Sequence, residues 1–566
     1  MNLSKTEPTT GQARRYAGAA LIALLMSGAA TGALAAPKHH RPHAKAPAID
    51  ARDARMAAMQ QQIDEMRAQM TQMAQMKGAD PGEARVAALR DQVDAVNAQL
   101  AEVKAAQTAD ATNIITLQAP PSGATTIPSL ANGKPAFATA DGRFTANIRA
   151  NVMFDGGKYF QKSDLPAQVT NRDLNSGTNF RRARFGVDGR IFKDFDYSMI
   201  MEFGGSGAEN AGQLYEFYIQ YTALKPWKIK LGAFEPKVGL AADVSTSQMP
   251  ILERPSPAEV ARNVAGGDSR AALQVFGNGV WGEGDTGIAT RWFLSGAATG
   301  NTVGTINSTG AATAQPADEQ TAMVGRLAIA PFSSTDWQAH FGVNAQYVTQ
   351  PNDAGAAASP RYPVQLRDRP ELRIDGARLV DTGAIDTRHV TVLGAEAGLT
   401  ARNFMIEGEY FNYRIDRRNA TNPLIAPGDP NFSGWYVTGV WVLTGESRAY
   451  NPAEARFDAP KPTYNFNPAA GTWGAFEIAA RYSDLDLNYH DCGAGKATPT
   501  VAGTACFDAI RGGEQKISTL GLNWYLNADI RFMLDYQHVD VNRYNAAGLQ
   551  VGQTYNAVAL RSQLSF

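Results

Sequence analysis

The segments Leu520-Gly-Leu-Asn-Trp-Tyr-Leu526 and Ile530-Arg-Phe-Met-Leu-Asp-Tyr536, followed by a last segment from Tyr555 to Phe566, alternate between apolar and polar residues. A period of two is that of a β-strand, because successive side chains point to opposite faces of a sheet. The apolar parity carries aromatic residues near the strand ends, and the opposite parity carries Asn523, Arg531, Asp535 and Arg561. This pattern predicts a barrel with lipid outside and water inside.

The chain ends on an aromatic residue, Phe566, with Leu564 and Leu560 at the same parity. Such an end resembles the terminal strand of bacterial outer-membrane proteins, which their assembly machinery reads. We therefore expect Phe566 to be recognised by the barrel assembly machinery, and the barrel wall to contact outer-membrane lipid and lipopolysaccharide.

The composition of the chain limits the class of protein and the kinds of partner to be expected. With 566 residues, 44% hydrophobic and 19% charged, the chain is long enough for one large domain with appendages, and its 53 glycines are typical of a strand-and-turn protein. The formal charge of −1 gives no argument for a nucleic-acid partner. Cys492 and Cys506 are the two cysteines, and they predict a possible disulfide in an oxidising compartment, with free thiols as the alternative. His490 is the single nearby histidine, so we expect no metal and no cofactor.

The first 50 residues carry export signals. Arg14 and Arg15 precede an apolar run from Tyr16 to Ala30 and a small-residue site, which predicts a secretory signal peptide over residues 1–35. Residues 36–50 are Pro-, His- and Lys-rich and are interpreted as a basic linker. After the signal, no run reaches the roughly 18 apolar residues that a membrane helix needs. A membrane-spanning chain of this kind must be a closed barrel.

Residues 51–106 have a helical period. Apolar residues at spacings of three and four run from Met56 to Met73 and from Val86 to Val103, with Gly78-Ala-Asp-Pro-Gly82 between them. So narrow a stripe predicts self-association as a coiled coil; the alternative is an antiparallel hairpin within one chain. Residues 107–140 are interpreted as a linker because they turn Pro-, Ser- and Gly-rich.

Strand-like alternation recurs through residues 141–566. The fold class predicted is an all-β transmembrane antiparallel barrel of about sixteen strands, preceded by the α-helical coiled-coil extension. The expected strands cover 144–154, 180–191, 197–203, 214–221, 227–234, 270–278, 287–296, 322–330, 337–347, 389–400, 404–413, 434–443, 474–487, 517–526, 530–536 and 555–566.

Short links between these strands, such as 193–194 and 527–529, alternate with long ones, such as 235–269 and 348–388. Periplasmic turns alternate with external loops in the same way, so both termini and the coiled coil are expected in the periplasm of a Gram-negative bacterium. The link 444–473 breaks the rule, because it is long yet falls on the turn side.

Several separated blocks resemble the phosphate-selective porins of the O/P type. They are Phe180-Arg-Arg-Ala-Arg184, Gly232-Ala-Phe234, Leu252-Glu-Arg254, Arg369-Pro-Glu371, Asp381-Thr-Gly383, Glu407-Gly-Glu-Tyr410, Leu443-Thr-Gly-Glu446, Gly474-Ala-Phe-Glu477, Arg481-Tyr-Ser-Asp-Leu-Asp-Leu487 and Leu520-Gly-Leu-Asn-Trp-Tyr525. The resemblance implies a homotrimeric channel that passes anions such as phosphate by passive diffusion, with its third long loop, 235–269, folded into the lumen.

The resemblance also directs attention to cationic side chains. Guanidinium forks match phosphate oxygens and stay charged, so we expect an anion path that includes Arg181, Arg182, Arg184, Arg190, Lys237, Arg254, Arg262 and Arg270. The alternative is a general porin, or one for another solute, in which Asp188, Glu202, Glu216 and Glu253 balance these charges.

The sequence also bears on two other function classes. An enzyme is not expected: Gly277-Asn-Gly-Val-Trp-Gly282 matches a dinucleotide fingerprint but is explained by a hairpin turn, and Asp484 and Asp486 are interpreted as lumen charges. A structural class remains open, in which the barrel anchors a coiled coil that tethers the outer membrane to peptidoglycan.

Overall fold

The structure is a computed structural model, and it describes residues 126–129, 135–162, 165, 167–205, 212–282, 290–303, 318–331, 336–418, 428–501 and 503–566. The predicted signal peptide, basic linker and coiled coil lie outside the described residues. No helix in the described part of the chain has the length and hydropathy needed to cross a membrane.

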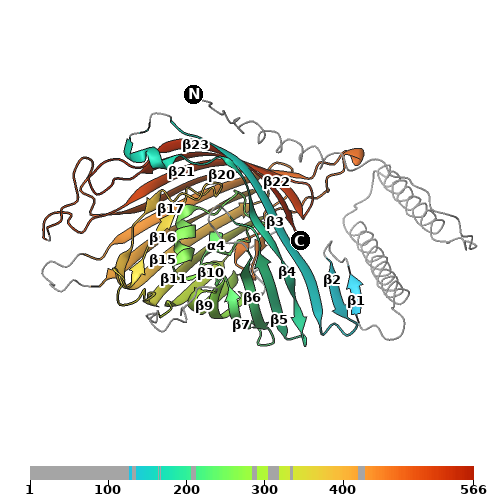
Figure 1. Cartoon of the computed structure of the whole chain (residues 1–566). Helices are drawn as coiled ribbons and strands as arrows, with labels where there is room; N and C mark the ends of the chain where they lie inside the picture. The colour runs from blue at the N-terminus through green and yellow to red at the C-terminus, as the bar shows by residue number, and fades with distance from the viewer. Residues whose placement is uncertain are drawn as a thin grey trace, which may run out of the picture. The chain divides into compact units, whose positions relative to one another are not determined.

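Sixteen described strands form a closed antiparallel barrel, as predicted (Figure 1). Each strand pairs with the next, and the last closes on the first through the partners Leu560 and Gly156. The strands are β3 (Thr145–Phe160), β4 (Gly177–Ile191), β5 (Phe195–Glu202), β6 (Gln213–Tyr221), β7 (Trp227–Phe234), β8 (Arg270–Trp281), β9 (Thr290–Thr302), β10 (Thr321–Ala330), β11 (Trp337–Gln350), β15 (Ile385–Ala401), β16 (Phe404–Arg417), β17 (Asn431–Val442), β20 (Ala475–Tyr489), β21 (Ile510–Tyr525), β22 (Ile530–Asn542) and β23 (Thr554–Ser565).

The two faces of the wall follow the alternation in the sequence. Leu520 and Leu560 are about half exposed on the outer face, whereas Asn523, Asp535 and Arg561 are fully buried on the inner face. This is the arrangement expected of a barrel whose outer face meets lipid.

Asp484 and Asp486 were expected in the lumen, and this expectation is wrong. They share the outer parity of β20 with Tyr482, whereas Leu485 and Leu487 are fully buried on the inner face. The inner face is apolar here because it is covered by a loop helix rather than by water. The usual polar-inside rule is therefore inverted at this end of β20.

The dinucleotide-like glycines also lie elsewhere than expected. Residues 277–281 belong to β8 itself, and of this motif Gly282 alone stands beyond the strand, with a positive φ of 79°. No hairpin turn is therefore needed to explain the first part of that motif.

A short hairpin precedes the barrel, within the segment interpreted as a linker. It consists of β1 (Thr126–Ser129) and β2 (Ala136–Thr139), and β2 pairs with the start of β3 through Ala136 and Asn147. The last strand leaves this stretch of β3 unpaired because Phe566 already lies opposite Ala150. The hairpin thus satisfies backbone groups that would otherwise form a free edge.

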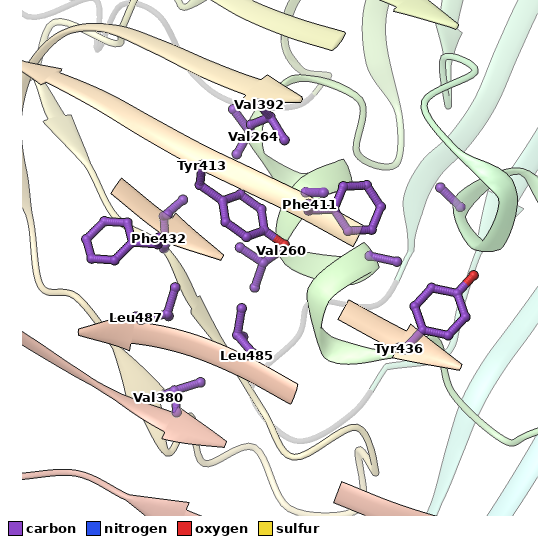
Figure 2. Packing of buried hydrophobic residues seen from close by; sticks show 14 of the residues in the cluster. Val260, Val264, Val380, Val392, Phe411, Tyr413, Phe432, Tyr436, Leu485 and Leu487 are labelled. Carbon is purple, nitrogen blue, oxygen red and sulfur yellow. The ribbon is translucent and has the colours of Figure 1, made fainter. Parts of the chain in front are cut away.

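The loop between β7 and β8 crosses the barrel interior. It contains α4 (Leu240–Asp243) and α5 (Ser256–Ala265), and α5 contacts β10, β11, β16, β17 and β20. Pro257 stands in the first turn of α5, where its missing N–H costs nothing, and Gly266 follows the last turn. Spacing of four places Val260 and Val264 on one side of the helix, facing Tyr413 and Val392 on the wall (Figure 2).

The loop between β11 and β15 also contributes to this core. It contains β12 (Pro363–Val364), which pairs with β15, and a small hairpin of β13 (Arg367–Asp368) and β14 (Val380–Asp381). Leu366, Leu372 and Val380 are buried in the same cluster as α5. The two loops together fill one side of the barrel.

The long link 444–473 folds inward from the terminus end. It contains β18 (Tyr450–Asn451), β19 (Arg456–Phe457) and the 3-10 turn η3 (Pro468–Ala470), and β19 contacts α4. Arg448 donates to both oxygens of Glu477 at 2.8 Å and to the Gln248 carbonyl at 2.9 Å. The link 444–473 is therefore long because it reaches the inward loop 235–269 and contacts it.

A further 3-10 turn, η2 (Ala167–Arg172), lies between β3 and β4.

Candidate functional site: two cationic cavities

A cavity of about 520 Å³ lies at the loop end of the barrel, and we call it the loop-side cavity. Its walls come from β4 and β6 on one side and from the two inward loops on the other. Four acidic residues line it: Glu202, Glu259, Asp268 and Asp368. Ten arginines line it: Arg181, Arg182, Arg184, Arg254, Arg262, Arg270, Arg367, Arg369, Arg373 and Arg378. The cavity therefore has a large excess of positive charge.

A second cavity, of about 830 Å³, lies at the end that holds Phe566, and we call it the terminus-side cavity. It too is rich in cations, with eight basic residues against four acidic side chains. The two cavities share Arg184, Tyr215 and Arg254. These three side chains therefore mark the point where the cavities adjoin.

One carboxylate, Glu253, is shared among four arginines, of which Arg181, Arg182 and Arg373 line the loop-side cavity. Glu253 lies 2.9 Å from Arg181, 3.5 Å from Arg182, 2.7 Å from Arg561 and 3.8 Å from Arg373. Burial disfavours its charged form, but these guanidinium groups hold the pKa of the Glu253 carboxyl well below its usual range. Asp155 also pairs with Arg561 and Glu259 with Arg373, so three carboxylates face these four guanidinium groups and a net positive charge remains.

Arg182 is the least satisfied member of this cluster. Its side chain is buried, its Nε has no hydrogen-bond partner in the described part of the chain, and one Nη contacts only the Met153 sulfur, at 3.4 Å. A buried guanidinium is costly unless it is fully hydrogen-bonded. An anion entering the cavity would supply the missing acceptor.

Arg184 stands where the cavities adjoin. Its Nε donates to Glu202 at 2.7 Å, and its guanidinium lies 3.4 Å from the centre of the Tyr215 ring. Stacking holds the guanidinium plane in place while leaving other N–H groups available. This geometry presents a positioned cation to both cavities.

Arg254, Arg262 and Arg270 line the loop-side cavity but also hold the inward loop. Arg254 donates to the carbonyls of Ala241, Ala242 and Val244, at the end of α4. Arg262 is surrounded by Glu235, Glu259 and Asp268. Arg270 donates to the Asn263 carbonyl at 2.8 Å. Lys237 lies in the terminus-side cavity, where it pairs with Glu454.

Arg190 is not brought to the site. It lies near the terminus end of β4, pairs with Asp196 at 2.7 Å, and lines neither cavity. The prediction that Arg190 lies on the polar face of β4 is correct, but its position along the strand places it away from the arginines around the loop-side cavity. Of the acidic residues expected to balance these cations, Glu202 pairs with Arg184 and Glu253 with Arg181 and Arg182. Glu216 and Asp188 pair instead with Lys230 and Arg149, which were not among the cations named.

Some lining residues were missed by sequence reasoning. Arg367, Arg373 and Arg378 come from the loop 351–384, where no strand period indicates which side chains point inward. Lys230 was also missed, although it has the inward parity of β7. Tyr215 has the parity of the outer-face residue Phe217 and lines the cavities where the register between β5 and β6 shifts, which strand alternation does not predict. The clustering of Arg367, Arg373 and Arg378 in the loop 351–384 is the sequence signal that could have identified them.

Cys492 and Cys506 form a disulfide in the loop between β20 and β21. The same loop contacts its neighbour, because the Gly495 N–H donates to the Gly548 carbonyl. In the described ranges, no group of three His, Cys, Asp or Glu side chains is placed to hold a metal ion.

Comparison with known proteins identifies the family. Residues 155–566 match the family model described as phosphate-selective porin O and P. Porin O of Pseudomonas aeruginosa is 23% identical over 416 residues, which are 70% of this chain and 84% of that protein. An uncharacterised protein of Caulobacter vibrioides is 24% identical over 469 residues, 81% of each chain.

Solved structures with a similar chain trace include the outer-membrane channel DcaP of Acinetobacter baumannii, at 11% identity and a TM-score of 0.40, covering 76% of this chain and 99% of that one. An anion-selective porin from Comamonas acidovorans has 10% identity and a TM-score of 0.39, covering 75% of this chain and 100% of that one. The family match spans most of the chain, from β3 to the last strand. The chain therefore belongs to the phosphate-selective porin O and P family, and it is an outer-membrane channel rather than an enzyme.

Proposed function

We propose that this channel conducts small anions, phosphate among them, through the loop-side and terminus-side cavities in succession. The observation that carries the proposal is the lining of the loop-side cavity, where ten arginines stand against four acidic residues, because this leaves a net positive charge facing the cavity. Arginine suits this role, since its planar fork matches two oxygens of a phosphate and its charge persists at any useful pH.

Conduction needs sites that bind an anion and also release it. Arg182 and Arg184 in the loop-side cavity, and Arg184 and Lys230 in the terminus-side cavity, offer a succession of cations along β4 and β7. Each of these cations has a carboxylate within 4 Å, Glu253 for Arg182, Glu202 for Arg184 and Glu216 for Lys230, so none holds an anion with its full charge. Several moderate sites in series let an anion exchange its water for protein donors and still leave.

The test is single-channel recording of the mature protein in a planar bilayer, with phosphate titrated against a chloride current. Stepwise currents that phosphate blocks at millimolar concentration or below are expected. Arg182→Ala should raise the half-blocking phosphate concentration about tenfold, the usual effect of losing one charge-assisted hydrogen bond. Steps that phosphate leaves unchanged would show that the channel is a general porin or serves another solute.

The assembly is also part of the proposal. We infer a homotrimer in the outer membrane, with residues 51–106 as a periplasmic coiled coil, because heptad seams of this kind bury their apolar stripe against other helices. Deleting residues 51–106 separates the alternatives. Loss of trimers in native gels assigns the segment to assembly, whereas intact trimers with a weakened envelope assign it to a peptidoglycan tether.

A further inference from the structure

A third cavity, of about 280 Å³, opens beside the loop-side cavity, and we call it the side pocket. The two share Asn263, Arg270, Thr302, Gln365 and Arg367, whereas the side pocket and the terminus-side cavity have no lining residue in common. Its other walls come from α5, β12 and the strands β9 to β15. The side pocket therefore branches from the proposed ion path and is not a segment of it.

Carboxamide side chains dominate the polar lining of the side pocket. The five are Asn263, Asn301, Gln320, Asn352 and Gln365. Some are oriented by one another: Asn301 donates to the Asn352 carboxamide oxygen at 2.8 Å, and Gln320 donates to the Val264 carbonyl at 2.7 Å. A carboxamide has two donor hydrogens and an acceptor oxygen, so each retains capacity for a ligand.

The remaining lining is apolar. Val260, Val348 and Val390 are almost completely buried, and each presents only hydrocarbon to the side pocket. Amides that both donate and accept, alternating with hydrocarbon, are complementary to a carbon chain that bears hydroxyl groups. An inorganic anion could accept from the amide N–H groups, but it would leave the hydrocarbon lining without an apolar partner.

Two guanidinium groups stand at the mouth. Arg270 is buried, and its Nε has no hydrogen-bond partner in the part of the chain that the structure describes. The Arg367 side chain is exposed and makes no hydrogen bond or ion pair within the described ranges. Both line the shared opening, so an anionic group held there would direct the rest of its molecule into the side pocket.

We propose that the side pocket binds the hydroxylated body of an organic phosphate monoester, a polyol or sugar phosphate, while Arg270 and Arg367 hold the phosphoryl group. The proposal rests on the proposed anion channel and names a substrate class for it. The volume of about 280 Å³ lies just below the roughly 300 to 1,000 Å³ typical of small-molecule sites, which favours a short polyol over a nucleoside.

The test compares three blockers of the chloride current through the full mature protein: inorganic phosphate, methyl phosphate and glycerol 3-phosphate. All three present a phosphoryl group of similar charge, but only the last bears hydroxyls. Glycerol 3-phosphate should half-block at a concentration about three- to tenfold below that of methyl phosphate, the gain expected from one or two added hydrogen bonds.

Val364→Phe fills the side pocket from β12 without touching an arginine. It should raise the half-blocking concentration of glycerol 3-phosphate about tenfold and shift the other two blockers by less than about twofold. The matched control is Val501→Phe, at a position that is 65% exposed in the disulfide loop, which should change none of the three.

Asn352→Asp provides a second variant that is independent of packing. An aspartate can still accept from Asn301 and from the Gln320 N–H, but it adds a negative charge to the side pocket and not to the loop-side cavity. It should weaken block by glycerol 3-phosphate more than block by inorganic phosphate.

The outcomes separate the two proposals. If inorganic phosphate does not block the parent channel, the proposed anion function itself is wrong. If it does block, but glycerol 3-phosphate is no better than methyl phosphate or both variants weaken all three blockers equally, then the side pocket does not bind organic phosphates and the channel remains.

Discussion

The two sides of the barrel interior differ in how their charges are used. On the filled side, next to β16, β17 and β20, wall carboxylates hold the inward loop: Glu409 accepts from the N–H groups of Leu240 and Ala241, at 2.8 and 2.9 Å. Arg481 likewise donates to the Glu253 carbonyl at 2.7 Å. On the open side, next to β4 and β6, guanidinium groups outnumber carboxylates around a cavity.

This difference indicates that the packing of the inward loop 235–269 determines which side of the barrel interior stays open to ions. On the filled side, charged side chains such as Glu409 and Arg481 bond to the loop backbone. On the open side, ten arginines face the loop-side cavity against four acidic residues. Each prediction below either removes that asymmetry or measures it.

The largest effect is expected from placing a charge in the filled side. Val260→Asp puts a carboxylate among Tyr413, Leu485 and Val264, where burial of an unpaired charge costs at least several kcal/mol. The loop should leave the wall, so single-channel conductance should rise severalfold and anion preference should fall. Val501→Asp, in an exposed loop, is the control; equal conductance in both variants would mean that α5 does not fill the lumen.

A smaller effect is expected from the wall carboxylate that holds α4. Glu409 accepts from two backbone N–H groups and from the Tyr436 hydroxyl, and glutamine offers only one acceptor oxygen. Glu409→Gln should therefore lower the free energy of unfolding by about 1 to 3 kcal/mol. Thermal unfolding in detergent measures this, with Glu514→Gln, whose partner is an outer-face lysine, as the unaffected control.

On the open side, Arg184→Ala should change selectivity more than stability. It removes the cation where the two cavities adjoin, so the anion-to-cation permeability ratio should fall by about three- to tenfold. Arg190→Ala is the matched control, because it removes an arginine of the same strand that lines neither cavity. Equal ratios in the two variants would contradict the proposed path.

The smallest effect is a dependence on pH. Burial raises the pKa of the Asp368 carboxyl to about 7, against the opposing charge of Arg373 and with Glu259 adding to the rise. The group is neutral below pH 7 and negative above it, so the loop-side cavity loses positive charge as pH rises. Chloride preference should fall by up to about twofold between pH 6 and 8. Asp368→Asn should make the chloride preference nearly independent of pH. If the preference of this variant still falls as pH rises, another group is responsible for the dependence.

The fold was predictable because a barrel wall repeats one simple rule. Alternation identified the wall strands and their faces, as in β21, where Leu520 is outside and Asn523 inside. The rule failed at Asp484 and Asp486, since a loop helix, not water, covers the inner face there. Which side of a strand faces inward depends on what occupies the interior, and that is a long-range contact.

The candidate site was predictable only in part for a similar reason. Arg182 and Arg184 could be placed by strand parity, whereas Arg181 has the outer parity and is buried at a register shift opposite Met153 and Phe154. Arg190 has the parity of Arg182 but lies at the rim. Height along the barrel depends on strand tilt and register, which the period does not encode. The arginines of the loop 351–384 have no period at all, and only the packing of that loop against α5 brings them to the cavity.

The most direct test of the central claim, that the open side carries anions, is the reversal potential of the mature protein in a salt gradient across a planar bilayer. The excess of arginines over carboxylates around the loop-side cavity predicts a potential of the sign set by chloride. A potential of the sign set by potassium would contradict the account, because the cavities would then conduct cations despite their lining.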